Sequence, residues 1–427
     1  MAQSKRLTLD RLRFALSRIN ERLWVKPLVL CVLSIGGTFI AMLADDLGLS
    51  DVVPEIAMES VESLLSIMAS SMLVVATFAV GSMVAAYASA SAGATPRSIP
   101  LVIADDVTQN ALSAFIGAFI FSIVSLITVQ NDLYDTAGMF AIFVLTLLVF
   151  AIVIITFVRW VDRIARLGRV VNTIEKAEKA AGDALDRRRR LPTLGALKAS
   201  PHQSDDQGIP ICSSTVGYIQ RIDLETLQSS AEALACRVVV LALPGKFVST
   251  SRPLIRIEGC REQCEAFNRD AFTSAFSISS SRTFEDDPRF GLLALSEIAD
   301  KALSPGINDP GTAINVIGTM VRLFTLWQSP LEGSLEPPSY DRVSVPELVV
   351  DDLFDDAFTA IARDGAGMVE VSIRLQKALW ALAETDDDAM VAAARKHSRM
   401  ALARSERAMS LPDDIDAVRR VAAFSAS

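Results

Sequence analysis

Four long apolar segments without any charged or histidine side chain alternate with short polar segments in the first part of this chain. They cover residues 27–44, 63–92, 107–130 and 136–158. A helix needs about 20 apolar residues to cross the hydrocarbon core of a bilayer, and each segment meets or approaches that length. The pattern predicts a four-helix transmembrane domain at residues 27–158.

The charges that flank these segments predict the orientation of the chain. Residues 1–26 form a basic segment, and Arg159, Arg163, Arg166 and Arg169 follow the fourth apolar segment. The loops after the first and third segments are acidic instead. Basic residues accumulate on the cytoplasmic side, so we expect a multi-pass protein of the bacterial inner (plasma) membrane, with its N-terminus and C-terminal domain in the cytoplasm.

Composition limits the chemistry of the polar region. The net charge is −9, so nucleic acid is not an expected partner. Five cysteines fit a reducing compartment. Cys260 and Cys264 do not predict a zinc site, because the chain has 2 histidines in all. We expect no metal and no other cofactor.

A basic amphipathic helix, 159–189, is predicted to continue the fourth segment into the cytoplasm, followed by a loop rich in Pro, Gly, Ser and Asp. Together they form a juxtamembrane helix and linker at residues 159–208. The arginine run 187–190 is predicted to contact anionic lipid.

From residue 209 the periodicity changes to short runs of apolar and β-branched residues. Strands are expected at 209–212, 216–222, 237–243, 247–257 and 275–279, with helices at 223–235 and 261–270. We therefore predict a small β-rich domain, 209–284, as a β-barrel or barrel-sandwich-like element. Residues 285–427 predict a helical C-terminal domain, with breaks near 304–308, 328–344, 364–367 and 411–413. The predicted fold class is a multi-pass α-helical membrane domain plus a cytoplasmic α+β domain.

The most distinctive motif lies between residues 282 and 313. Asp287–Pro288 and Asp309–Pro310 each place an N-cap aspartate before a first-turn proline, which predicts a tightly capped helical hairpin. A functional interpretation is also open, in which polar side chains near the second helix start bind an anion, a metal ion or a partner loop. Glu285, Asp286, Glu297 and Asp300 would add charges nearby. The candidate residues are Arg282, Asp287, Ser304, Pro305, Asn308, Asp309, Pro310 and Thr312.

This motif carries a family resemblance. The matching residues are Asp287, Phe290, Gly291, Leu295, Ile298, Ala299, 302–305, 307–310, Thr312 and Ala313, with further matches at Trp24, Pro27, Pro96, Arg97, Gln109, Phe115, Gly117, Phe119, Gly217, Tyr218, Asp223, Gly245, Phe247 and Val248. Over residues 20 to about 330 the chain resembles the domain-of-unknown-function 2254 family of predicted bacterial membrane proteins. Gly311 departs from the bulkier residue that the resemblance implies. The family has no established activity, so the resemblance supports the topology.

The second apolar segment is rich in small and hydroxyl-bearing residues. It predicts either a central packing helix or a helix that lines a pore. The possible pore-lining residues are Ser63, Ser66, Ser70, Thr77, Gly81 and Ser89, and Glu59 and Glu62 would form an acidic outer mouth.

These patterns favour a homo-oligomeric, gated conduit for ions or small solutes, regulated by its cytoplasmic domain. The alternative is a non-conducting scaffold or regulatory protein that docks a cytoplasmic protein partner. An enzyme is not expected, because no histidine lies near the motif and the chain has no nucleophile elbow or phosphate loop.

Overall fold

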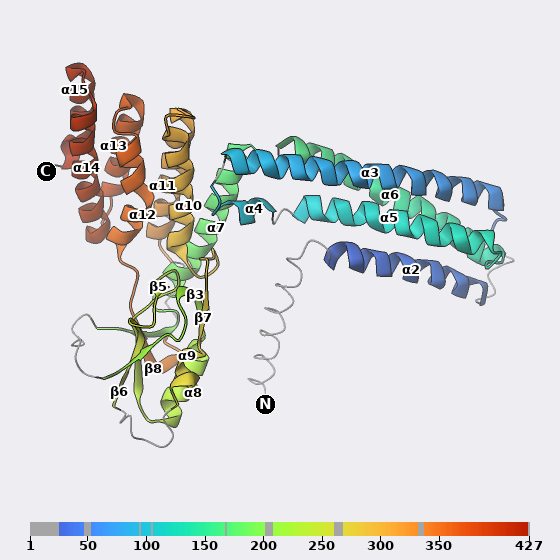
Figure 1. The fold of residues 1–427 in the computed structure, drawn as a ribbon, viewed down its shortest axis with the longest axis horizontal. Helices are drawn as coiled ribbons and strands as arrows, with labels where there is room; N and C mark the ends of the chain where they lie inside the picture. Colours follow the sequence, from blue (N-terminus) through green and yellow to red (C-terminus); the bar gives the residue numbers. More distant parts are fainter. Residues whose placement is uncertain are drawn as a thin grey trace. The chain divides into compact units, whose positions relative to one another are not determined.

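The computed structural model describes residues 25–46, 53–93, 95–103, 106–166, 169–200, 208–259, 268–331 and 337–425. Most of the predicted basic segment 1–26, most of the predicted helix 261–270, and both Cys260 and Cys264 lie outside these residues. The chain divides into two compact units, the first ending at Asn172 and the second covering Thr173–Ser427 (Figure 1).

The first unit is helical. Its helices are α2 (Val25–Asp46), α3 (Met58–Gly93), the short α4 (Ile99–Ile103), α5 (Asp106–Gln130) and α6 (Thr136–Arg166). Four stretches are long and apolar enough to cross a membrane, namely Val25–Met42, Met58–Ser89, Val107–Gln130 and Thr136–Ile164. The four predicted membrane segments are confirmed.

Helix α5 is the centre of this unit, since it packs against α2, α3 and α6. Half of its apolar span is buried, compared with 11% for the α2 span. Two of its buried hydroxyls bond to the helix itself: Ser113 Oγ donates to the Gln109 carbonyl at 2.7 Å, and Ser122 Oγ donates to that of Ala118 at 2.8 Å. Each hydroxyl therefore satisfies its donor without water, as a helix in lipid requires.

The second unit contains two sheets. The strands are β1 (Ala196–Lys198), β2 (Ile209–Cys212), β3 (Gly217–Ile222), β4 (Arg237–Val240), β5 (Phe247–Val248), β6 (Pro253–Glu258), β7 (Phe276–Ser279) and β8 (Tyr340–Val345). Their order is β1-β8-β4-β6-β2 in the larger sheet and β5-β3-β7 in the smaller one. Neither sheet closes on itself within the described residues, so the predicted β-barrel is not confirmed.

Strand β8 was not expected, because the sequence predicts a break between helices in this region. It pairs in parallel with both β1 and β4, and its Val343 and Val345 enter the core with 0% exposure. The region 285–427, predicted as helical with a break at 328–344, therefore also contains a strand. The strand has only 6 residues, and its partners are distant in sequence, so no local signal identifies it.

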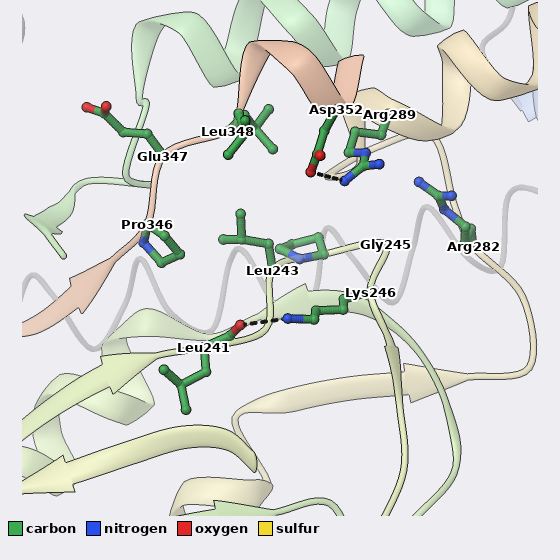
Figure 2. Close-up of a pocket in the computed structure, with 12 residues that line it drawn as sticks. Leu241, Leu243, Gly245, Lys246, Arg282, Arg289, Pro346, Glu347, Leu348 and Asp352 are labelled. Atoms are coloured by element: carbon green, nitrogen blue, oxygen red, sulfur yellow. Dashed lines mark hydrogen bonds and ion pairs between the residues drawn. The ribbon is translucent and has the colours of Figure 1, made fainter. Parts of the chain in front are cut away.

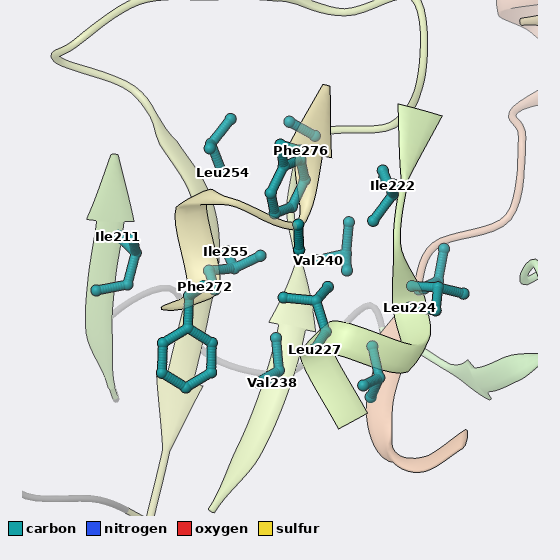
Figure 3. Close-up of a cluster of buried hydrophobic side chains, with 14 of the residues drawn as sticks. Ile211, Ile222, Leu224, Leu227, Val238, Val240, Leu254, Ile255, Phe272 and Phe276 are labelled. Atoms are coloured by element: carbon teal, nitrogen blue, oxygen red, sulfur yellow. The ribbon is translucent and has the colours of Figure 1, made fainter. Parts of the chain in front are cut away.

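The core of the sheets lies between their strands and two helices, α8 (Leu224–Ala233) and α9 (Arg269–Thr273). Figure 3 shows Leu227 of α8 and Phe272 of α9 beside strand residues such as Val238 and Ile255. All of these side chains are at most 1% exposed. The predicted helix at 223–235 is confirmed.

Helices form the rest of the second unit and stand side by side in Figure 1. They are α7 (Val170–Arg190), α10 (Pro288–Leu303), α11 (Pro310–Gln328), α12 (Val350–Asp364), α13 (Val369–Ala383), α14 (Asp388–Ala408), α15 (Pro412–Ala422) and the 3₁₀ turn η1 (Ala423–Ser425). Helix α10 packs against α11 and α12, and α13 packs against α11, α14 and α15.

The predicted continuous helix from 159 to 189 is wrong. Helix α6 ends at Arg166, Arg169 is not helical, and a separate α7 begins at Val170.

Helix α7 packs against α10 through small residues, because a Cβ on Gly291 of α10 would collide with Ala181 of α7. The two helices therefore approach closely at Gly291.

Candidate functional site

Asp287 organises the start of α10. Its carboxylate is 1% exposed and accepts a cap bond from the Phe290 N–H at 3.3 Å. Arg282 donates to the same carboxylate through Nε at 2.6 Å and through Nη2 at 3.0 Å. Burial raises the pKa of Asp287, and the hydrogen bonds and charge of Arg282 oppose that rise. Removing either partner would leave a buried charge unpaired.

Gly245 brings the loop between β4 and β5 onto this ion pair. Its φ of +88° is a left-handed conformation, and a Cβ there would collide with the Asp287 carboxylate. The Gly245 N–H donates to the Ile219 carbonyl at 2.7 Å, which ties the loop to β3. The sheets and the helices of this unit therefore meet at the Arg282–Asp287 pair.

The arginine run at the end of α7 reaches the loop before α10. Arg187 donates to the Glu285 carbonyl, and Arg188 donates to the Asp286 carbonyl at 3.4 Å. Arg188 is 3% exposed, and burial lowers its pKa to about 10. The prediction that this run contacts lipid is therefore wrong for Arg188, which lies inside the second unit.

The second half of the motif forms the turn between α10 and α11. Asn308 has a φ of +51°, which asparagine tolerates better than most residues. Asp309 accepts from the Thr312 N–H at 3.1 Å and from the Thr312 hydroxyl at 2.6 Å, and Pro310 occupies the first turn of the helix. These bonds also lower the pKa of Asp309. The predicted capped hairpin is confirmed.

An open cavity of about 650 Å³ adjoins this turn. Ser304, Pro305 and Asn308 line one side of it, together with Asp300 from α10. Burial and the nearby charges of Asp364 and Glu297 raise the pKa of Asp300 to about 7, and Arg363 opposes the rise. Asp300 Oδ1 is buried and has no hydrogen-bond partner in the part of the chain that the structure describes.

The eight candidate motif residues form two clusters instead of one site. Arg282 and Asp287 lie at the start of α10, and the other six lie beyond its end. Because α10 has 16 residues, the two clusters are separated by a helix about 24 Å long. No group of three His, Cys, Asp or Glu side chains among the described residues is arranged to hold a metal ion.

Five of the six possible pore-lining residues share one face of α3, and Ser89 is turned about 80° away from Gly81. Ser63, Ser66, Ser70, Thr77, Gly81 and Ser89 are exposed, as is Glu59, while Glu62 is half-buried. The opposite face carries buried residues such as Val61, Leu65 and Met72. The hydroxyl-bearing face therefore points away from the other helices of the unit.

Charged groups on α12 were missed in the sequence. Arg289 donates to Asp352 at 2.7 Å and to Asp356 at 2.6 Å. On α14, the buried His397 has its Nε2 at 3.7 Å from Asp351 and 3.5 Å from Asp355. Asp352 and Asp356 are four residues apart and face Arg289, and Asp351 and Asp355 are four residues apart and face His397. This spacing was the signal in the sequence that could have identified the acidic face of α12.

Four apolar helices of membrane-crossing length define an integral membrane protein. The family described as "Predicted membrane protein (DUF2254)" matches residues 20–381, so the chain belongs to this family. Uncharacterized proteins of Mycobacterium tuberculosis and Mycobacterium bovis are each 28% identical to it over 152 residues. The match covers 32% of this chain and 29% of each relative. No solved structure matches.

Proposed function

We propose that this protein is a homo-oligomeric conduit for ions or small solutes in the bacterial inner membrane, with its C-terminal unit in the cytoplasm as the regulator. One observation carries the proposal: the hydroxyl-bearing face of α3 is exposed along the apolar span. In an oligomer this face would surround a central axis. The basic residues 1–26 and those at the end of α6 support the orientation.

The positions on α3 support a shared face. At about 100° per residue, Ser63, Ser66, Ser70, Thr77 and Gly81 fall within a sector of about 60°. Ser70 and Thr77 donate to the Ser66 and Leu73 carbonyls of the same helix, at 3.0 and 2.8 Å, and their oxygens can still accept from water. Small side chains along one face also allow close contact with another helix. If neighbouring subunits contact one another along the edge of this sector, its hydroxyl groups would face a central conduit, with the exposed Glu59 at one end.

The test is ion flux through liposomes that contain the purified protein. The variant Ser70→Ala/Thr77→Val removes two exposed hydroxyls with little change in volume. Thr156→Val makes the same chemical change on α6, where the side chain is half-buried, and is the matched control. We expect the protein to conduct above empty liposomes, the double variant to change the flux severalfold, and the control to match the unmodified protein.

Equal flux in all three proteins would overturn the assignment of α3 to the conduit. No flux for any common cation or anion would favour the second candidate, a scaffold that docks a cytoplasmic protein. One surface feature supports that candidate: Trp380 is 47% exposed and stacks on Phe424 at a ring distance of 6.3 Å. Determining the mass of the purified protein in detergent separately tests whether it is an oligomer.

A further inference from the structure

A second cavity, of about 370 Å³, lies within the second unit at the junction of its sheets and helices. Figure 2 shows its lining. The loop after β4 provides Leu243 and Lys246, the start of α10 and the preceding loop provide Arg289 and Arg282, and the connection from β8 to α12 provides Leu348. The cavity therefore combines apolar walls with three cationic side chains.

Both arginines are held in place and still have donors available. Arg282 uses Nε and Nη2 on Asp287, and Arg289 uses Nε and Nη1 on Asp356 and Asp352. This leaves Nη1 of Arg282 and Nη2 of Arg289 without a hydrogen bond to any described residue. In Figure 2 both guanidinium groups lie at the same end of the cavity. Prearranged guanidinium donors of this kind recognise planar oxyanions.

The charge balance favours an anion with a single charge. Arg282, Arg289 and Lys246 are offset by Asp287, Asp352 and Asp356, and the further lining residue Glu347 is paired with Lys198 at 2.7 Å. A dianion would therefore add two negative charges to a neutral cluster. A carboxylate adds one, and its two oxygens match two guanidinium edges.

The start of α12 adds a weaker attraction for an anion. Val349 lines the cavity and occupies the N-cap position of α12, where no side chain caps the helix. The first N–H groups of a helix carry partial positive charge, so they favour an anion in this cavity.

We propose that this cavity binds a small organic carboxylate, with its carboxylate on Arg282 and Arg289 and its apolar body against Leu243, Pro346 and Leu348. The site is independent of conduction by the membrane helices. The bound molecule would contact the loop after β4 as well as α10 and the approach to α12, so it would join the sheets to the helices of the unit.

The test is calorimetric titration of the full-length protein in a neutral detergent with three probes. Phenylacetate carries both the carboxylate and an apolar body, acetate lacks the body, and phenylacetamide lacks the charge. We expect phenylacetate to bind at least about tenfold more tightly than either of the others, because each control removes one class of contact. No saturable binding of phenylacetate, or equal binding of all three probes, would overturn the proposal.

Variants locate the binding. Arg289→Gln is expected to weaken phenylacetate binding by about tenfold or more, the usual effect of losing a charged hydrogen bond. Lys246→Gln changes an exposed side chain that makes one bond, to the Leu241 carbonyl at 3.2 Å, and should weaken binding about threefold without affecting the fold. Lys377→Gln, at an exposed position on α13, is the matched control and should bind like the unmodified protein.

The same heat of binding in all four proteins would indicate partition into detergent and would overturn the proposal. If Arg289→Gln proves unfolded by circular dichroism, the Lys246→Gln and Lys377→Gln pair decides the outcome. Weaker binding by Lys246→Gln alone supports the site, and equal binding by Lys246→Gln and Lys377→Gln overturns it.

Discussion

Replacing Gly245 with alanine should destabilise the second unit by about 2–5 kcal/mol. A left-handed conformation costs a residue with a Cβ about 1–2 kcal/mol, and the φ of Gly245 is +88°. The new Cβ would also lie 2.6 Å from Oδ1 of Asp287 and closer to its other carboxyl atoms. That carboxylate cannot move without lengthening its two bonds to Arg282, and disturbing a buried charged pair costs about 1–3 kcal/mol more.

Gly195→Ala is the matched control. Gly195 has a similar φ of +83°, but the nearest atom to an added Cβ is 3.9 Å away, so only the backbone term of about 1–2 kcal/mol applies. The assay is pulse proteolysis of the full-length protein in detergent across a urea series, with detection of a C-terminal tag. If both alanine variants unfold at the same urea concentration, the contact between Gly245 and Asp287 contributes nothing, and the reasoning is refuted.

Three further predictions use the same assay. Asp309→Ala should cost about 1 kcal/mol at neutral pH, as loss of a helix cap does, and the difference should vanish as the pH falls through the lowered pKa of Asp309. Asp300→Asn should be neutral near pH 4 and stabilising by about 1 kcal/mol at pH 8. The folded carboxyl has a raised pKa of about 7, so it keeps a proton that the unfolded chain releases, and the stability of the unmodified protein falls as the pH rises toward 7. Equal stability of the variant and the unmodified protein at both pH values would contradict this. Gly291→Val should cost about 1–3 kcal/mol by overpacking against Ala181, and a neutral effect would show that α7 and α10 can separate freely.

Local features of the fold were predictable from the sequence. The caps on α10 and α11 are encoded by an aspartate directly before a proline, and the membrane segments by about 20 apolar residues in a row. Each signal lies within the element that it specifies. The capped hairpin and the positions of the four membrane helices could therefore be predicted.

Contacts between distant segments could not be predicted. The sequence identified Asp287 as a cap, but its contact with Gly245 depends on a loop that lies more than 40 residues earlier in the chain. From the sequence alone, the six-residue segment of β8 is predicted to be a connection between helices, and only its pairing with β4 identifies it as a strand. The cavity beside Arg289 depends on both of these contacts, so it was not foreseen.

The position of β8 has a consequence for biosynthesis. The larger sheet has β8 between β1 and β4, yet β8 leaves the ribosome after α10 and α11. Until then β4 lacks a neighbour on one edge, and the valines of β8 are absent from the core. Unpaired strand edges on a nascent chain promote aggregation. A chain truncated before Tyr340 should therefore be a target for chaperones and proteases, even if all four membrane helices have already inserted.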